Sequence, residues 1–407
     1  MTAHGETFIV VGAGHAGGRA VEALRNQGFA GRIVLTGAEP HLPYERPPLS
    51  KELMQDKPGY AFSFIRDRAF YDENEVELCL GVAATALDVS AKRLRLADGH
   101  ELAWDRLLLT TGGRVRRLDL PGADLANIHT LRTVDDSRAI TSGLTPGARA
   151  VIVGGGFIGL EVAASARRRG AEVTVLEAAD RLMGRAVAPD VAALFVDLHR
   201  AAGVEVRLGA AVAGFEGTAA VKAVATGDGD HPADLAVVGI GIAPETELAA
   251  AAGLAVDNGV VVDEHCRTSA PDIFAAGDAT NHFNPRYGRH MRLESWHNAQ
   301  NQAIAAARAM CGDDAPYAEV PWFWSDQFDA NLQMAGVPAT WDETVSRGDQ
   351  VQRNFISFQI AGGRVVGATA INRARDMTVA RRLIARESPV TLAALADEDT
   401  PLRSLLG

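Results

Sequence analysis

The chain has 407 residues, which at about 150 residues per domain is enough for two or three domains. Hydrophobic residues make up 47% and charged residues 22%, an ordinary balance for a globular protein. The 40 basic and 51 acidic side chains give a formal net charge of −11, which argues against binding to the phosphate backbone. Nucleic acid is therefore not an expected partner.

Cysteine usage and hydropathy indicate the compartment. The three cysteines are far apart and form no C-x-x-C pair, which favours a reducing compartment over a secreted disulfide framework. The longest apolar runs, such as residues 235–243, are shorter than the roughly 18 residues of a membrane-spanning helix. No signal peptide is evident. We expect a cytoplasmic enzyme without membrane partners, present as a monomer or a weak homodimer.

An internal repeat is the most informative feature of the chain. Residues 7–39 and residues 149–178 each read as a β-branched strand, a glycine turn, an amphipathic helix and a second strand. Two such units predict two nucleotide sites, or one site and a degenerate copy.

Both copies carry the G-x-G-x-x-G pattern of a dinucleotide-binding turn. Its glycines are Gly12, Gly14 and Gly17 in the first copy and Gly154, Gly156 and Gly159 in the second. The first glycine permits the tight turn, the second lets the backbone approach a pyrophosphate, and the third allows close helix packing. Free N–H groups at the helix start would face the phosphates. We therefore expect a dinucleotide at each turn.

Acidic residues near the ends of the second strands bear on the choice of nucleotide. Glu177 ends the second strand of the second copy, where a carboxylate can bind an adenosine ribose and repel a 2′-phosphate. This favours NADH, although Arg181 and Arg185 lie close by, and a solvated glutamate is the alternative. In the first copy Gly37 takes that place, so whether Glu39 binds a ribose is open.

The rest of the chain suggests how the units are connected. Residues 106–115, a buried-type strand running to Gly112-Gly113, and residues 234–244 look like crossings between domains. Residues 355–371 alternate as a hairpin, and residues 377–386 read as a helix.

These patterns predict an α/β fold with two doubly wound, Rossmann-like dinucleotide-binding domains and a smaller α+β C-terminal domain. We expect the first domain to comprise residues 1–114 and 244–320. The second would comprise residues 115–243, and the third residues 321–407.

Asp278 ends the run I-F-A-A-G-D at a strand terminus, where its carboxylate could bind a polyol such as the ribityl chain of a flavin. The alternative is an N-cap for a helix that should follow.

Neither glycine turn is followed by the cysteine pair of a dithiol flavoenzyme. The histidines show no zinc or iron–sulfur spacing, so no metal site is expected. Hydride chemistry needs none of these groups, because a bound cofactor supplies the reactivity.

Several further segments recur in one known family. They are H-L-P-Y-E-R-P-P-L-S-K-E-L-M at residues 41–54, G-G-G-F-I-G-L-E, I-F-A-A-G-D, E-S-W-H-N-A-Q-N-Q-A and P-W-F-W-S-D-Q. With the opening glycine motif, they resemble the FAD-dependent ferredoxin–NAD(+) reductases of bacterial oxygenase systems over nearly the whole chain. The segments R-P-P-L-S-K and P-W-F-W-S-D-Q are more specific than the glycine motifs.

The resemblance implies FAD on the first unit and NADH on the second. Arg46 and Lys51 would approach the flavin, and Glu161 would pair with Lys51 near the nicotinamide as the catalytic pair. A lysine and a glutamate there could balance the charge of a reduced, anionic ring. Otherwise Lys51 is a solvated loop cation and Glu161 a first-turn helix acid. The resemblance also places Arg132 near the FAD and Asp278 on its ribityl chain.

The same resemblance implies that the C-terminal domain covers the flavin. Trp296 would lie beside the isoalloxazine, while Trp322, Trp324 and Asp326 belong to the covering segment. Packing between domains is the alternative for the tryptophans and is compatible with covering. Further expected cofactor-binding residues are His15, Ala16, Val82, Ile158, Arg185, Gly241 and Gly277.

The implied activity is hydride transfer from NADH to FAD, followed by single-electron transfer to a [2Fe–2S] ferredoxin that supplies a monooxygenase or dioxygenase. Because chain and ferredoxin are both acidic, docking needs a local basic patch, for which Arg286, Arg289 and Arg292 are candidates. A solvated face is the alternative. Rival functions are an NADH oxidase, a rubredoxin or quinone reductase, and an NADH sensor resembling apoptosis-inducing factor.

Overall fold

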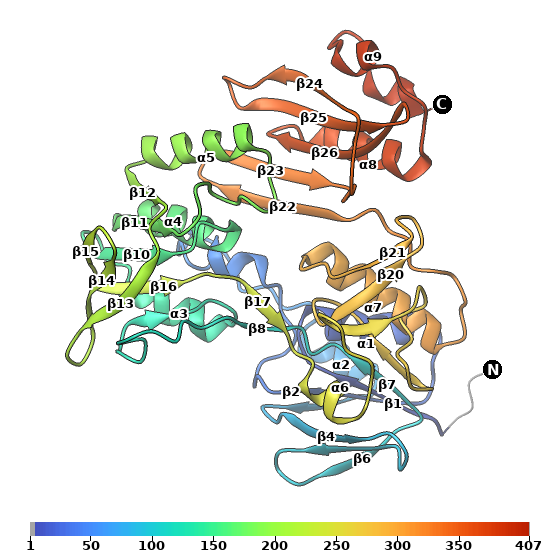
Figure 1. Cartoon of the computed structure of the whole chain (residues 1–407). Helices are drawn as coiled ribbons and strands as arrows, with labels where there is room; N and C mark the ends of the chain where they lie inside the picture. Colours follow the sequence, from blue (N-terminus) through green and yellow to red (C-terminus); the bar gives the residue numbers. More distant parts are fainter. Residues whose placement is uncertain (1–4, 407) are drawn as a thin grey trace.

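The computed structural model describes residues 5–406, which fold into three packed parts (Figure 1). The first part holds the N-terminal strands, the second is built around the second glycine motif, and the third is the C-terminal sheet with its helices. Over residues 5–406, none of the helices combines the length and the apolar character needed to cross a membrane.

The first part is built on a parallel sheet whose strands come from two distant segments. In spatial order they are β19 (Ile273–Ala275), β7 (Arg106–Leu109), β1 (Thr7–Val11), β2 (Arg32–Gly37) and β3 (Val76–Leu80). Helices α1 (His15–Asn26) and α7 (Trp296–Met310) cover one face, and the antiparallel strands β4 (Ala84–Asp88), β5 (Arg93–Leu96) and β6 (Glu101–Ala103) cover the other. Both faces are buried, which explains the apolar runs of the central strands β1 and β7.

The second part repeats this plan. Its parallel sheet has the order β12 (Val204–Leu208), β11 (Glu172–Glu177), β10 (Arg149–Val153), β16 (Leu235–Val238) and β9 (Ile128–His129). Helices α3 (Val134–Gly143), α4 (Phe157–Arg168) and α5 (Pro189–Ala201) lie on one face, and strands β13 (Val212–Gly217), β14 (Val221–Thr226) and β15 (Gly229–Pro232) on the other. The predicted internal repeat and the predicted fold class are confirmed.

Two short strands connect these parts. β8 (Gly113–Val115) and β17 (Ile242–Pro244) pair antiparallel, so both crossings of the chain run side by side. The strand predicted to reach Gly112 is too long. It ends at Leu109, and Gly112 turns with a φ of +71° before β8 begins.

The third part is an antiparallel sheet. Its order is β22 (Trp322–Gln327), β23 (Ala330–Ala335), β26 (Arg364–Ile371), β25 (Asn354–Ala361) and β24 (Glu343–Asp349), accompanied by α8 (Ala374–Arg386), α9 (Leu392–Ala396) and η2 (Leu402–Leu406). The predicted hairpin is confirmed as β25 and β26, and the predicted helix as α8, which begins earlier, at Ala374. The remaining elements are η1 (Pro47–Ser50), α2 (Arg68–Glu73), α6 (Glu247–Ala251), β18 (Val260–Val262), β20 (Thr280–Asn284) and β21 (Arg289–Met291).

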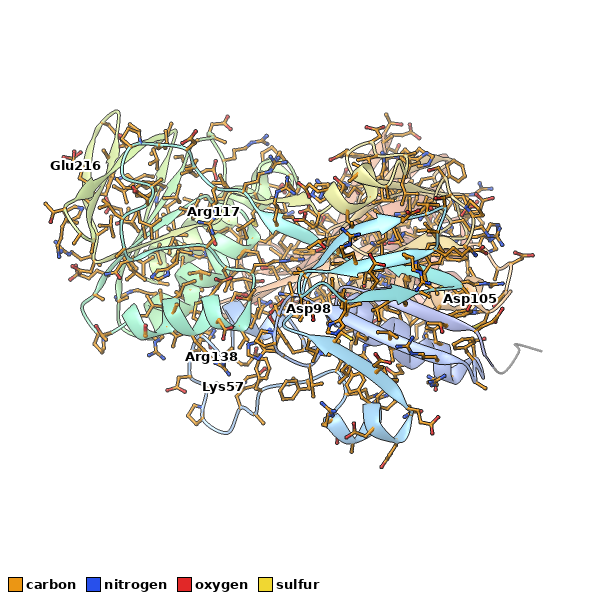
Figure 2. The ribbon with its side chains drawn as sticks, turned by 90° about the horizontal axis from the view of Figure 1, so that it is seen from below. Lys57, Asp98, Asp105, Arg117, Arg138 and Glu216 are labelled. Carbon is orange, nitrogen blue, oxygen red and sulfur yellow. The ribbon has the colours of Figure 1, made fainter. Side chains whose placement is uncertain are left out.

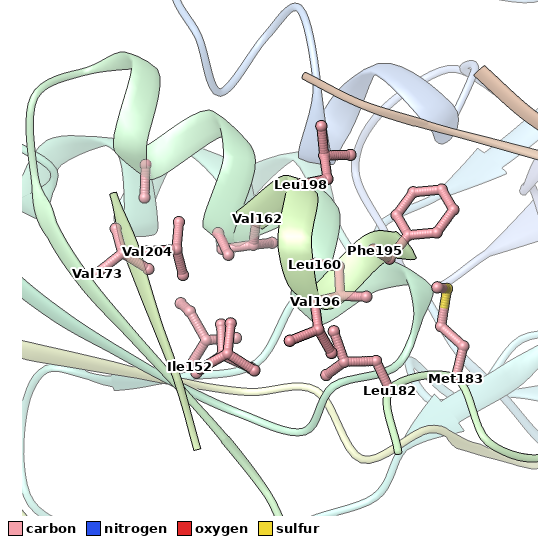
Figure 3. Close-up of a cluster of buried hydrophobic side chains, with 14 of the residues drawn as sticks. Ile152, Leu160, Val162, Val173, Leu182, Met183, Phe195, Val196, Leu198 and Val204 are labelled. Carbon is pink, nitrogen blue, oxygen red and sulfur yellow. The ribbon is translucent and has the colours of Figure 1, made fainter. Parts of the chain in front are cut away.

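One hydrophobic cluster joins all three parts. Figure 3 shows side chains of the second part within it, among them Leu160 of α4 and Phe195 of α5. The same cluster includes Met54 of the first part and Leu332 and Phe355 of the C-terminal sheet. Burying these residues together fixes the C-terminal sheet against α4 and α5.

Most charged side chains lie on the outside of the molecule, with Lys51, Glu161 and Arg347 among the buried exceptions. Figure 2 labels Lys57, Asp98, Asp105, Arg117, Arg138 and Glu216, all of them exposed. Exposed charges of both signs are spread over both dinucleotide-type parts, so the net charge of −11 does not translate into a uniformly acidic surface.

The shared cluster leads to a stability prediction. Leu332 is fully buried where the C-terminal sheet meets the second part, so Leu332→Ala should lower the free energy of unfolding by about 2–5 kcal/mol. Val351 is 94% exposed, and Val351→Ala should change this energy by less than about 0.5 kcal/mol. Urea unfolding followed by circular dichroism measures both. Equal effects of the two variants would contradict the shared core.

Candidate functional site

A cavity of about 1540 Å³ lies between the three parts. It is lined by both glycine turns, by the carboxyl ends of β1, β7, β10 and β16, and by Phe323 and Trp324 of β22. Ligands of open α/β sheets bind at these strand ends. An ordinary small-molecule pocket measures about 300–1,000 Å³, so this cavity has room for more than one such ligand.

The first glycine turn leaves space for a phosphate. A Cβ at Gly17 would lie 1.9 Å from the carbonyl oxygen of Gly12, so this glycine allows α1 to pack closely. A Cβ at Gly14 would instead face the cavity, with the Arg46 guanidinium 3.5 Å away. No side chain caps α1 at Gly14, so its first N–H groups are free for an anion.

The second glycine turn has the same form. A Cβ at Gly159 would lie 2.1 Å from the carbonyl oxygen of Gly154, whereas one at Gly156 would meet no atom within 4 Å. Glu177 closes this turn, because its carboxylate accepts hydrogen bonds from the backbone N–H groups of Gly155 at 2.6 Å and Ala179 at 2.8 Å. Its carboxylate is therefore held at the cavity wall.

The two residues expected to form the catalytic pair meet between the turns. Lys51 Nζ lies 2.9 Å from Glu161 Oε1, and the Glu161 side chain is only 3% exposed. Two hydroxyl groups also donate to this carboxylate, Ser325 Oγ at 2.7 Å and Ser50 Oγ at 2.5 Å. The three donors balance a charge that would be costly to bury alone.

A second polar cluster lies beside the first turn. Arg46 donates to Glu39 at 2.7 Å, and Tyr44 donates to the same carboxylate. Arg46 also donates to the carbonyl of Arg132, whose guanidinium lies 3.3 Å from Asp278 Oδ2. Burial raises the pKa of Tyr44, which keeps the phenol protonated as a donor. These contacts fix Glu39 and Asp278 at the cavity.

Trp296 is held on the same side. Its Nε1–H donates to Glu45, and His15 Nδ1 lies 3.3 Å from this carboxylate. Burial alone would raise the pKa of Glu45, but His15, Trp296 and Arg19 together lower it. His15 Nε2 is buried at the cavity without a hydrogen-bond partner in the described chain, so a ligand group could satisfy it.

Two aromatic residues of β22, Phe323 and Trp324, line the cavity from the C-terminal part. Trp324 lines the cavity, meets Trp296 edge-on at 5.7 Å, and has Lys51 Nζ 5.6 Å from its ring centre. Trp322 does not line the cavity but stacks on Trp324 at 5.0 Å. Asp326 accepts a hydrogen bond from the indole of Trp324. Packing and covering are thus combined in one cluster.

The other sequence-predicted residues divide into two groups. Those that line the cavity are Gly12, Ala16, Gly154, Ile158, Arg185, Gly241 and Gly277. Gly17 and Val82 do not, within the described cavity wall. Val82 donates its N–H to the carbonyl of Gly37 and packs against the core, while its neighbours Ala83 and Ala84 reach the cavity. The prediction of a helix after Asp278 is wrong, because the next element is strand β20, which begins at Thr280.

Sequence reasoning missed the residues that hold Glu161. Ser50 stands in the R-P-P-L-S-K segment and Ser325 in P-W-F-W-S-D-Q, beside residues that were named. Alternation along a strand was the available signal. It places Phe323, Ser325 and Gln327 on one face of β22, opposite to Trp322, Trp324 and Asp326. The sequence did not reveal which element the face with Ser325 and Gln327 would meet.

Family comparisons agree with this geometry. Residues 6–303 match the model described as pyridine nucleotide-disulphide oxidoreductase, and residues 322–406 match the one described as reductase C-terminal. The chain belongs to the pyridine nucleotide-disulphide oxidoreductase family. In this oxidoreductase Cys79, Cys266 and Cys311 are all unpaired.

Individual relatives show which members of this family the chain is similar to. The ferredoxin–NAD(+) reductase component of the anthranilate 1,2-dioxygenase system of Burkholderia cepacia is 46% identical over 98% of this chain and 99% of its own. Rhodocoxin reductase of Rhodococcus erythropolis is 41% identical over 98% and 93%. The reductase in the covalent putidaredoxin reductase–putidaredoxin complex superposes with a TM-score of 0.95, at 38% identity over 99% of each chain. The resemblance to ferredoxin–NAD(+) reductases is confirmed.

The contact between α7 and α8 of this oxidoreductase leads to a pH prediction. His297 Nε2 accepts hydrogen bonds from Arg381 at 2.8 Å and Asn301 at 2.9 Å. Burial, with the nearby charge of Arg381, lowers the pKa of His297 to about 4. The unfolded chain, with a histidine pKa of about 6.5, therefore binds more protons between about pH 6.5 and 4, and stability falls as the pH falls.

We expect His297→Gln, which keeps an acceptor but cannot titrate, to lose less stability on acidification than the parent protein. The loss in the free energy of unfolding should differ between the variant and the parent protein by at most about 1.4 kcal/mol per pH unit. Urea unfolding at about pH 7 and about pH 5 measures it, with His231→Gln on the edge strand β15 as the control. A difference that is independent of pH would contradict the assignment.

Proposed function

We propose that the chain is a ferredoxin–NAD(+) reductase, with FAD at the first glycine turn, NADH at the second and a [2Fe–2S] ferredoxin as the acceptor. One observation carries this proposal. Both dinucleotide turns open into the same cavity, and the Lys51–Glu161 pair lies between them. The names of the full-length relatives support the same activity, including its link to oxygenase systems.

The residues around the first turn fit FAD. Gly14 leaves an open cradle beside uncapped N–H groups for the pyrophosphate. Asp278, fixed by Arg132, would bind the ribityl hydroxyls, and the unpartnered His15 Nε2 would meet a polar group of the cofactor. Bound FAD would accept a hydride from NADH and release the two electrons singly.

The protein side chains then have separate tasks. Lys51 holds a positive charge at the cavity wall, where it would offset negative charge on a reduced ring. Glu161 keeps the Lys51 ammonium in place and lies on helix α4, which follows the second turn. Trp296 and Trp324 line the cavity and would limit the access of water to a bound cofactor.

The choice of NADH rests on Glu177. Its carboxylate is fixed by two backbone N–H groups and would meet the 2′-hydroxyl of an adenosine ribose. A 2′-phosphate there would be repelled. Arg181 and Arg185 also line this end of the cavity, and we assign them to the pyrophosphate and adenosine region.

The domain division and the compartment complete the proposal. We propose divisions at residues 114, 243 and 320, supported by the paired crossings β8 and β17. We also propose a cytoplasmic location, because all three cysteines are unpaired.

Stopped-flow spectroscopy tests the main proposal. Mixing the FAD-loaded protein with NADH should bleach the flavin within seconds, and a [2Fe–2S] ferredoxin should restore its colour much faster than air. Lys51→Met should slow bleaching by about ten- to a hundredfold, since a positioned charge contributes about 1.5–3 kcal/mol. Lys57→Met, in an exposed loop, is the matched control. Faster reoxidation by oxygen or quinone would overturn the ferredoxin partner.

The proposed docking patch makes a separate prediction. Arg286 donates to the carbonyls of Ala318 and Ile384, and Arg292 pairs with Glu294, so both are held within the protein. Arg289 on strand β21 also donates to a backbone carbonyl, that of Val337, but it is the exposed member of the three, so a partner can reach it most readily.

Arg289→Glu should raise the KM for ferredoxin about threefold or more and flatten its dependence on salt, because it removes a steering charge. The NADH-driven bleaching rate should not change. Steady-state ferredoxin reduction at low and high salt measures the effect, with Arg138→Glu on α3 as a control for net charge. An equal KM in both variants would remove Arg289 from the docking surface.

A further inference from the structure

A buried chain of hydrogen bonds runs along the face of β22 that meets α4 and α5, and it leads to Glu161. His199 Nε2 on α5 lies 2.9 Å from Gln327 Oε1, and Gln327 Nε2 donates to Ser325 Oγ at 3.1 Å. Ser325 Oγ then donates to Glu161 Oε1 at 2.7 Å. His199, Gln327 and Ser325 are all fully buried. We call these three residues the Ser325 chain.

The direction of every bond in this chain follows from its chemistry. The Glu161 carboxylate paired with Lys51 can only accept, so the Ser325 hydroxyl must donate to it. Ser325 then accepts from the amide of Gln327, which turns the Gln327 carbonyl toward His199. Burial lowers the pKa of His199, and the neutral ring donates from Nε2. Each member therefore has one orientation.

Counted with its bond to Glu161, the Ser325 chain crosses the interface between the second part and the C-terminal sheet twice. It starts on α5, passes through β22 and ends on α4, where Glu161 binds Lys51 of the first part. Its surroundings are apolar, since the cluster around Phe195 and Leu332 lies at the same interface. In such surroundings a polar group without its partner is costly, so the chain strongly favours one docked arrangement.

We propose that Ser325, oriented by Gln327 and His199, is a positioning residue for the Lys51–Glu161 pair. This inference rests on the proposed function and deepens it, because it assigns the C-terminal domain a part in hydride transfer as well as in covering the cavity. Ser50 holds the other carboxylate oxygen at 2.5 Å. Without Ser325, Glu161 keeps Lys51 on Oε1 and Ser50 on Oε2 but loses its only donor from the C-terminal sheet in the described chain.

The test compares the limiting rate of flavin bleaching with the NADH concentration that gives half of it. Ser325→Ala should lower the limiting rate about tenfold, the effect of one hydrogen bond to a charged group, and leave the half-saturating concentration within about twofold. Gln327→Met should lower the limiting rate less, about threefold, because the Ser325 hydroxyl that donates to Glu161 is still present. Ser325→Thr should restore the rate. Ser357→Ala, from an exposed hydroxyl pair on the same sheet, is the matched control.

A double-mutant cycle separates positioning from simple packing. If Ser325 acts through Glu161, then Glu161→Gln with Ser325→Ala should be no slower than Glu161→Gln alone. The thermal unfolding midpoints of the same four proteins should likewise be non-additive. Additive losses in both readouts would overturn the proposal. So would a Ser325→Ala protein that melts earlier yet is reduced at the parent rate.

The failure of the proposed function would look different. In that case the parent protein itself would not be bleached by NADH, and the unfolding midpoints alone would decide whether Ser325 and Glu161 are coupled. Additive midpoints would then overturn the Ser325 chain as well. FAD content, measured by absorbance for every variant, excludes loss of the cofactor as the cause of a slow rate.

Discussion

The buried carboxylate of Glu161 is the constraint on which the arrangement of the three parts depends. A charge this deeply buried needs donors, and leaving it without its partner would cost about 3–5 kcal/mol. Its donors come from the two other parts of the molecule. Ser50 and Lys51 belong to the first part, and Ser325 belongs to the C-terminal sheet. The satisfied carboxylate therefore requires that the C-terminal sheet, helix α4 and the loop after η1 meet at one point.

The internal repeat explains why that point lies in a cavity. Each copy ends its first strand in a glycine turn, and both sheets present their carboxyl edges to each other across the paired crossings β8 and β17. Because a ligand site of an open parallel sheet forms at this edge, two facing sheets produce one shared site. A single copy could hold a dinucleotide, but it could not bring two of them together.

The sequence determined the fold more fully than the site. Glycine spacing and apolar runs act locally, so the repeat, the hairpin over residues 354–371 and helix α8 could all be predicted from them. Asp278 shows the limit, since the same aspartate could cap a helix or precede a strand, and tertiary pairing of β20 with β18 decided for the strand. Val82 is a second example, because its backbone bond to Gly37 and its packing against the core are tertiary contacts that the local sequence does not indicate. Ser325 and Gln327 were missed because their partners are more than a hundred residues away.

Strand β22 shows how register links these observations. It is an edge strand, bonded only to β23 in the described sheet, and it packs against helices α4 and α7 of the other two parts. Successive side chains point to opposite faces, which sends Trp322 and Trp324 toward Trp296 and sends Ser325 and Gln327 toward helices α4 and α5. A slip of one residue would exchange the faces, remove the hydroxyl from Glu161 and bury indoles against the carboxylate. The hydrogen bonds of the Ser325 chain and the stacked indoles therefore specify the same register from opposite sides, and each makes the other's geometry unique.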